Sequence, residues 1–145
     1  MLLPFSLSAR PYIGLSQGNV STSLELGMVG RRAEQSLSLS VPTLESSSPL
    51  TMPSVQARLF FRTQRFSPIV LGVGLLGAVG WQDANAWAVG LGGSVALSYE
   101  FIAKRGILFV EGSYLPLLSV QGTAVDPAME HQMKQYVRIG YRQVL

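Results

Sequence analysis

Apolar and polar residues alternate with a period of two over several stretches of this chain. In residues 20–28 the even positions hold Val, Thr, Leu or Met, and the odd positions hold Ser, Glu or Gly. The same alternation recurs in residues 35–41 and 55–59. Because successive side chains of a β-strand point to opposite faces, each stretch is predicted to be a strand with one apolar and one polar face.

Turn residues between these stretches divide the chain into eight predicted strands. Their expected ranges are 3–15, 20–29, 35–41, 54–62, 69–81, 86–101, 107–115 and 133–144. Pro11 lacks the amide donor that a strand ladder needs, so a bulge or an unpaired stretch is expected there. Several strands reach the roughly ten residues that a tilted strand needs to cross a bilayer. No helical period or domain boundary interrupts the series, so residues 1–145 are predicted to form one domain.

The basic residues support a count of eight strands. In an antiparallel barrel the connections alternate between two ends, and connections 30–34, 63–68 and 103–106 fall at the end that holds both termini. They carry Arg31, Arg32, Arg65, Lys104 and Arg105. The connections at the other end are 16–19, 42–53, 82–85 and 116–132, and their sequences contain neither Lys nor Arg. This segregation played no part in choosing the strands.

Aromatic residues also gather near the predicted strand ends. Trp81, Trp87 and Tyr114 fall toward the long-loop end, and Phe61, Tyr99, Phe101 and Tyr141 fall toward the short-turn end. Two aromatic bands around an aliphatic middle are typical of a barrel that crosses both interfaces of a bilayer. We therefore interpret these seven residues as an aromatic girdle.

Composition sharpens this picture. Hydrophobic residues make up 48% of the chain and charged residues only 13%, against about 25% charged in ordinary soluble domains. No run of 18 apolar residues is present, so a membrane-spanning helix is not expected. The predicted strand 86–101 has one large apolar face and one face of Gly, Ala and Ser with Glu100. That second face carries too little charge for a solubilising exterior, but it suits the narrow interior of an eight-stranded barrel.

In these features the chain resembles the superfamily of small eight-stranded outer-membrane β-barrels. The resemblance rests on the two-residue period, the alternating connections and the aromatic bands, and no family-specific motif accompanies it. It implies an all-β, closed, up-and-down transmembrane barrel in an outer membrane, in contact with membrane lipid, with short periplasmic turns and longer external loops. The last residue, Leu145, departs from the Phe or Trp that usually ends the insertion signal of such barrels.

The polar strand faces supply charges that would lie inside such a barrel. They are Glu25, Arg58, Arg62, Glu100, Glu111, Arg138 and Arg142. Charges in a narrow interior are costly unless they are paired, so we expect a ladder of Glu–Arg ion pairs that plugs the barrel. A ligand site or an ion path is the alternative. We expect Phe60 and Tyr136, together with the arginines, to fill the space beside the glycines of residues 72–80 and 90–92.

Other candidate chemistry is sparse. Residues 72–77 match the G-x-G-x-x-G pattern of dinucleotide sites, but no helix is predicted after them, so we interpret these glycines as strand residues that line the inside of the barrel. With no cysteine and one histidine, no metal site or cofactor is expected. The basic residues are dispersed, which argues against nucleic-acid binding. His131 beside Glu130, with Ser113 or Ser119, could form a lipid-hydrolysing centre.

We therefore expect a non-enzymatic structural, anchoring or partner-binding role in the cell envelope. Connections 42–53 and 116–132 are the candidate contact sites for other envelope proteins, because each contains apolar residues. These residues are Leu44, Leu50, Met52, Leu117, Leu118 and Met129. They could equally fold back over the barrel mouth. Two alternatives stay open: a lipid-modifying enzyme that uses His131, and a soluble barrel that binds a small apolar ligand and has its small polar face outside.

Overall fold

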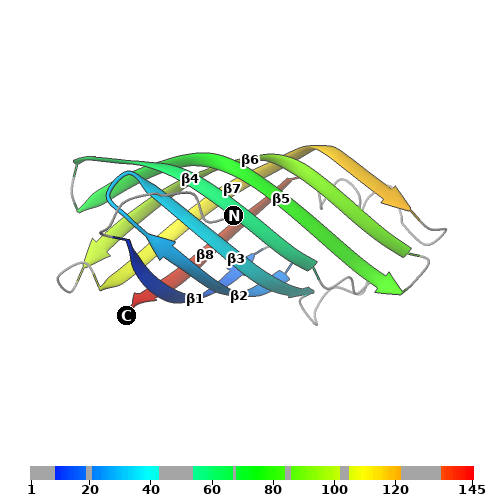
Figure 1. Ribbon diagram of the computed structural model, residues 1–145, viewed down its shortest axis with the longest axis horizontal. Helices are drawn as coiled ribbons and strands as arrows, with labels where there is room; N and C mark the ends of the chain where they lie inside the picture. Colours follow the sequence, from blue (N-terminus) through cyan, green and yellow to red (C-terminus); the bar gives the residue numbers. More distant parts are fainter. Residues whose placement is uncertain are drawn as a thin grey trace.

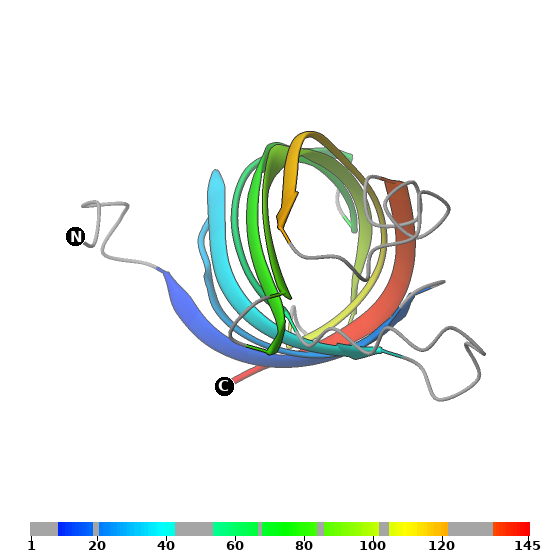
Figure 2. The same ribbon diagram turned by 90° about the vertical axis from the view of Figure 1, so that its right-hand side faces the viewer.

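The computed structural model describes residues 9–18, 21–42, 54–66, 68–83, 86–101, 105–121 and 135–145. Its strands are β1 (Arg10–Gly18), β2 (Ser21–Val29), β3 (Ala33–Pro42), β4 (Ser54–Phe66), β5 (Ile69–Asp83), β6 (Ala86–Phe101), β7 (Gly106–Gln121) and β8 (Gln135–Val144). Each strand pairs antiparallel with the next, and β8 pairs with β1, so the sheet closes on itself (Figures 1 and 2). The predicted closed, eight-stranded, up-and-down barrel is confirmed.

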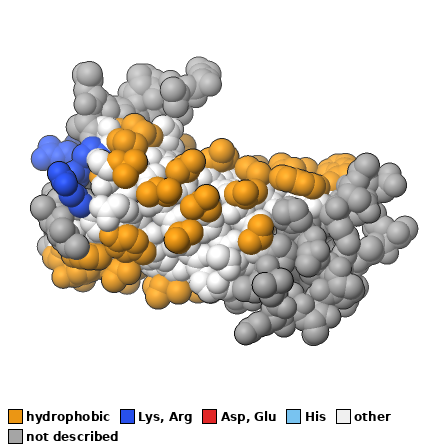
Figure 3. All heavy atoms as spheres, turned by 90° about the horizontal axis from the view of Figure 1, so that it is seen from below, with side chains coloured by type: hydrophobic (Ala, Val, Ile, Leu, Met, Phe, Trp, Pro, Cys, Tyr) orange, Lys and Arg blue, Asp and Glu red, His pale blue; other side chains and the backbone are white. Residues whose placement is uncertain are grey.

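The barrel carries its apolar side chains outside and its polar side chains inside. On β2, Leu24 and Leu26 are 45% and 57% exposed, whereas Glu25 between them is fully buried. On β6, the face with Trp87 and Val89 lies outside, and the face with Ser94 and Glu100 is buried. Figure 3 shows apolar side chains spread along the visible outer surface. The small polar face is therefore the interior one, which reverses the arrangement of a water-soluble domain.

The strands differ in length, and this makes one side of the barrel taller. The strands β5, β6 and β7 have 15, 16 and 16 residues, against 9 or 10 in β1, β2, β3 and β8. Figure 1 shows the three long strands continuing past the short ones at one end. Within the described part of the chain, no helix is long and apolar enough to cross a bilayer.

The prediction that β7 ends at residue 115 was wrong, because a bulge displaces the alternation there. Leu91 pairs with Leu117 and Gly93 pairs with Tyr114, so Leu115 and Pro116 together face Gly92. A bulge tolerates proline and shifts the following side chains to the other face. Tyr114 and Leu117 accordingly both lie outside, at 50% and 67% exposed. Leu117 and Leu118 therefore belong to β7 and not to a loop.

Of the two irregularities expected at Pro11, the bulge is absent, and a stretch outside the ladder register occurs only on the side of β8. Arg10, Pro11 and Tyr12 pair in unbroken register with Val29, Met28 and Gly27 of β2. The register with β8 begins only at Tyr12, and the Pro11 carbonyl accepts a hydrogen bond of 2.9 Å from the Leu145 amide. Pro11 thus lies at the end of the β1–β8 ladder, where its missing donor interrupts nothing.

Several other strand boundaries also differ from expectation. The strand β1 continues to Gly18, through part of the predicted 16–19 turn. The strand β4 continues to Phe66 with an irregularity after Thr63, where a turn was predicted at 63–68. The strand β3 begins at Ala33, so Glu34 is a strand residue and not part of a 30–34 turn. Residues 1–8 of the predicted first strand lie outside the described residues.

Candidate functional site

Charged side chains fill much of the barrel interior. Among the described residues, four glutamates and four arginines point inward, and none of these side chains is more than 6% exposed. They are Glu25, Glu34, Glu100, Glu111, Arg58, Arg62, Arg138 and Arg142. Their formal charges cancel. Because a buried charge is costly without a partner, the pairing of this set determines whether the interior is stable.

Glu111 of β7 holds two arginines that come from different strands. Its Oε1 accepts 2.9 Å from Arg58 Nε of β4, and its Oε2 accepts 2.9 Å and 2.5 Å from Arg138 Nε and Nη2 of β8. Ser113 donates to Oε1 over 3.1 Å. Arg58 also donates to Ser38 over 2.8 Å and to Gln56. Since β4 lies across the barrel from β8, these contacts bridge the interior.

Glu25 of β2 forms the next level with two arginines of β8. Arg138 Nη1 and Arg142 Nη2 lie 3.1 Å and 2.9 Å from its carboxylate oxygens. These are close approaches of opposite charges and not aligned hydrogen bonds. Tyr12 donates to Glu25 over 2.5 Å and to Glu34 over 3.1 Å. Arg142 Nη1 also lies 2.8 Å from Glu34, which links this level to β3.

Arg62 of β4 closes the network near the rim where β1 begins and β8 ends. Its guanidinium pairs with Glu100 of β6 and lies 3.7 Å from Glu34 Oε2. Its Nη1 donates over 2.7 Å to the carbonyl of Gly30, in the turn between β2 and β3. This arginine therefore joins the interior network to a turn at the rim of the barrel.

Aromatic rings and glycines complete the packing around the arginines. The Arg142 guanidinium carbon lies 4.0 Å from the centroid of Phe109, and that of Arg138 lies 5.0 Å from it, which are cation–π distances. Gly140 faces Phe109, and a Cβ there would come within 2.6 Å of the ring. A Cβ at Gly27 would likewise come within 2.5 Å of the Tyr12 ring. These two glycines leave space that the rings occupy.

Neutral side chains line the interior beside these charged groups. Ser23 and Ser40 are hydrogen-bonded at 2.7 Å, and Tyr136 donates to Gln56 over 2.7 Å. Phe60 is buried against Gly72 of β5, where a Cβ would lie 3.3 Å from its ring. Within the described residues, β5 contributes no charged side chain to the interior pairs.

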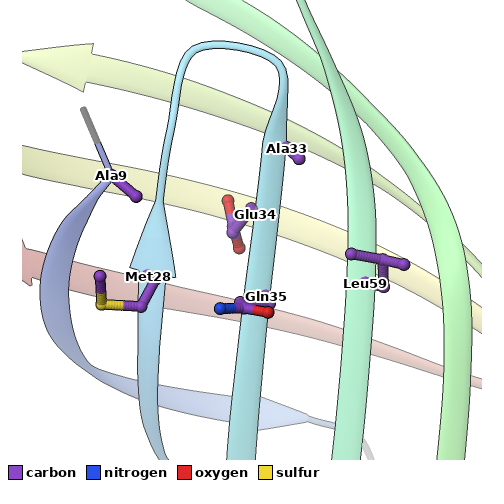
Figure 4. A pocket seen from close by; sticks show the side chains of 6 residues that line it. All are labelled: Ala9, Met28, Ala33, Glu34, Gln35 and Leu59. Atoms are coloured by element: carbon purple, nitrogen blue, oxygen red, sulfur yellow. The ribbon is translucent and has the colours of Figure 1, made fainter. Parts of the chain in front are cut away.

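Two pockets are candidate ligand sites, but one is too small and the other too open to indicate a ligand. One lies near the rim with the termini, between β2, β3 and β4, and has a cavity volume of about 20 Å³, roughly the space of one water molecule (Figure 4). It is lined by Ala9, Met28, Ala33, Glu34, Gln35 and Leu59. The other is an open groove of about 470 Å³ between β7 and β8, next to Tyr114 and Tyr136. In the described ranges, no group of three or more His, Cys, Asp or Glu side chains could hold a metal ion.

The candidate enzyme residues are not brought together among the described residues. Ser113 is buried and donates to Glu111, whereas Ser119 is exposed on the outer face of β7. Glu130 and His131 lie outside the described residues, as do Leu44, Leu50, Met52 and Met129. The G-x-G-x-x-G glycines at 72, 74 and 77 all lie within β5. Gly72 is buried on the inner face, as interpreted from the sequence, but Gly77 shares the outer face with Leu75 and Val79, so that interpretation was wrong for Gly77.

The seven girdle residues all lie on the outer surface. Trp81 and Trp87 are direct partners near the far ends of β5 and β6. Tyr114 lies opposite Gln135 at the last β7–β8 pair, several residues short of the tryptophans along the ladder. At the end that holds the termini, the Phe101 ring centroid lies 6.2 Å from that of Tyr99 and 6.1 Å from that of Tyr141, and Phe61 is exposed on β4.

Sequence reasoning missed three interior residues: Tyr12, Glu34 and Phe109. Tyr12 shares the inner face of β1 with Gly14, and Phe109 shares the inner face of β7 with Glu111. The alternation alone could have placed both. Glu34 was missed because the start of β3 was placed one residue beyond it.

Comparison with known proteins supports the fold. No protein-family model matches the sequence, and no curated protein matches it. Among solved structures, the barrel is similar to the crystal structure of Neisserial surface protein A (NspA), with a TM-score of 0.52 and 14% sequence identity. The match covers 94% of this chain and 96% of that chain. A likeness at this identity shows a shared fold.

Proposed function

We propose that this chain is an integral outer-membrane β-barrel with a non-enzymatic role in the cell envelope. The observation that carries the proposal is the inverted surface of a closed barrel: exposed Leu, Val and Ile outside, and ion pairs inside. Exposed apolar area costs about 25 cal/mol per Å² in water, and in lipid that cost disappears. Closure of the sheet also leaves no strand edge unpaired in the apolar region.

Two observations support the membrane setting. Aromatic side chains lie outside at both ends of the barrel, which is where the bilayer interfaces favour them. The fold is shared over nearly the whole chain with a protein named as a surface protein of Neisseria. The soluble-barrel alternative needs the small polar face outside, and that face is buried.

Extraction of native membranes tests this location. An integral barrel stays in the pellet after high salt or alkaline carbonate and is released only by detergent. Release by salt or carbonate without detergent would overturn the proposal. A peripheral outer-membrane protein of the same cells serves as the control for complete carbonate extraction.

The interior network is proposed to act as a plug that stabilises the barrel. Eight strands leave an interior just wide enough for side chains, and here Arg58 of β4 and Arg138 of β8, which come from opposite sides of the barrel, meet at Glu111. We therefore expect no steady single-channel conductance from purified protein in planar bilayers. Reproducible conductance steps that disappear when the protein is omitted would show an open path and contradict the plug.

The segments after β3 and β7 are proposed to provide contacts with other envelope proteins. The apolar residues Leu44, Leu50 and Met52 follow β3 in the sequence. We expect the triple variant Leu44→Ser, Leu50→Ser, Met52→Ser to keep a folded barrel and to lose any larger complex seen when native protein is purified in mild detergent. A wild-type protein that purifies alone from its native membrane would overturn this part of the proposal.

A further inference from the structure

Four arginines lie exposed at one end of the barrel, and we call them the basic collar. Arg10 begins β1, Arg31 and Arg32 form the turn between β2 and β3, and Arg105 precedes β7. The topology places all four at the end where β1 begins and β8 ends. Figure 3 shows Lys and Arg side chains gathered at one end of the molecule, beside the apolar outer surface.

The basic collar has no acidic partner among the described side chains. The described glutamates are Glu25, Glu34, Glu100 and Glu111, and all four point inward and pair with interior arginines. Because the interior charges cancel, the outer charge of this end is positive. The arginines with described side chains thus form two groups of four: one group is paired inside the barrel, and the other is exposed in the collar.

Hydrogen bonds to the barrel hold the backbone of the collar. The amide of Gly30 donates to the Ala33 carbonyl over 2.9 Å, which closes the turn that carries Arg31 and Arg32. The Arg62 amide donates to the Arg32 carbonyl over 2.8 Å, and the Arg62 side chain donates to Gly30. The Val144 amide donates to the Arg105 carbonyl over 2.7 Å. The guanidinium groups therefore extend from a fixed ring and not from free chain ends.

The collar adjoins aromatic side chains that mark an interface level. Arg105 is next to Gly106, where a Cβ would lie 2.8 Å from the Phe101 ring, so that ring covers Gly106. Phe101 in turn contacts Tyr99 and Tyr141. Aromatic rings of this kind sit at the headgroup level of a bilayer. Basic groups just beyond them are at the depth of lipid phosphates.

We propose that the basic collar binds the headgroups of anionic phospholipids in the leaflet at this end of the barrel. The inference rests on the proposed function, because it needs a barrel that is inserted in a bilayer. The chemistry is charge complementarity: guanidinium groups bind phosphate oxygens with paired donors, and four of them without acidic neighbours favour a negatively charged lipid surface. Among the described residues the exposed arginines all lie at this rim, so we assign the preference to the leaflet on this side.

Spin-labelled lipids test the proposal with the whole protein reconstituted in phosphatidylcholine vesicles. The fraction of motionally restricted label is measured for phosphatidylglycerol and for phosphatidylcholine. We expect the protein to favour phosphatidylglycerol by about two- to fivefold at low salt. The preference should fall toward one in 1 M salt, where the Debye length is about 3 Å.

Two matched variants separate charge from structure. In the variant Arg10→Gln, Arg31→Gln, Arg32→Gln, Arg105→Gln the preference should be lost, and in the variant with Lys at the same four positions most of it should remain. If the fourfold Gln variant does not insert, the single variants Arg31→Gln and Arg105→Gln are measured instead, and each should lower the preference.

The outcomes distinguish the two proposals. Protein that floats with vesicles but shows equal association with both lipids overturns the collar proposal and leaves the membrane barrel standing. Protein that floats with neither neutral nor anionic vesicles overturns the membrane barrel, and the collar proposal falls with it. A preference that survives the Gln substitutions unchanged also overturns the collar, because other residues would then carry it.

Discussion

The arginines of this barrel occupy two opposite environments. Arg58, Arg138 and Arg142 are buried and paired with glutamates from other strands. Arg31 and Arg105 are exposed at one rim, with no described acidic partner. The same side chain therefore serves as a cross-link in one region and as a free surface charge in the other. Burial sets the difference: a charge removed from water must be matched locally, whereas water and salt screen an exposed one.

This contrast also explains the low charge content of the chain. A water-soluble domain spreads charged residues over its surface. Here the described outer surface carries charge only at one rim, and half of the arginines with described side chains are inside the barrel. The two regions should therefore respond very differently to substitution.

Removing the shared carboxylate at the centre of the network should have the largest effect. Glu111→Gln leaves Arg58 and Arg138 buried without their common anion. Breaking a buried ion pair by removing one partner typically costs about 3–5 kcal/mol. We expect a loss of that size in the free energy of unfolding, measured by urea titration in lipid vesicles with tryptophan fluorescence.

Ser113→Ala is the matched control for that variant. It removes one hydrogen bond to the same carboxylate and should cost only about 1 kcal/mol. If the two variants lose the same free energy, the network does not stabilise the barrel through its charges.

A charge placed on the apolar outer surface, at the middle of a strand, should have the next largest effect on stability. Leu37 lies outside in the middle of β3, and an arginine there would face the lipid tails. Leu37→Arg should lower the free energy of unfolding in vesicles by about 2–4 kcal/mol. Thr63→Arg, at an exposed position on β4 closer to the basic end, should cost about 0–1 kcal/mol. Equal losses of stability from the two substitutions would count against a bilayer around the middle of the barrel.

A methyl group added at the contact between β1 and β2 should have an intermediate effect. A Cβ on Gly27 would meet the Tyr12 ring at 2.5 Å and the Gln35 carbonyl at 2.6 Å. Overpacking of this kind usually costs about 1–3 kcal/mol, so Gly27→Ala should shift the urea midpoint downward. Gly77→Ala is the control, because a Cβ there meets no atom within 4 Å. A Gly27→Ala variant as stable as Gly77→Ala would show that the Tyr12 ring moves aside freely.

The fold could be predicted from the sequence because the two-residue period survives in nearly every strand. In β6 the period is unbroken, and the predicted and observed bounds agree. The prediction from this period failed at Pro116. One extra residue in β7 shifts the alternation there, so the residues that follow were predicted to be a loop. A bulge is set by the partner strand as much as by its own residues, so a single strand read alone does not reveal it.

The interior set was partly predictable for the same reason. Seven inward charges follow from strand parity, and the structure places all seven in ion pairs. Their partners could not be read from the sequence, because Arg142 meets Glu25 and Glu34 only after β8 closes on β1. The odd or even position of a residue along its strand decides whether its side chain points inward or outward. Register and barrel closure decide which side chains meet across the interior.

Neutralising three of the four arginines of the basic collar should have the smallest effect on stability. Arg31→Gln, Arg32→Gln and Arg105→Gln remove exposed charges with no described acidic partner, and surface changes of this kind usually stay within about 0.5 kcal/mol. We therefore expect the triple variant to unfold at the wild-type urea concentration in zwitterionic detergent micelles. Arg62→Gln, which removes a buried charge of the same type from between Glu34 and Glu100, should unfold at a clearly lower concentration. If the collar variant were destabilised as strongly as Arg62→Gln, the exposed arginines would be part of the barrel's own framework, and the distinction between the two groups would fail.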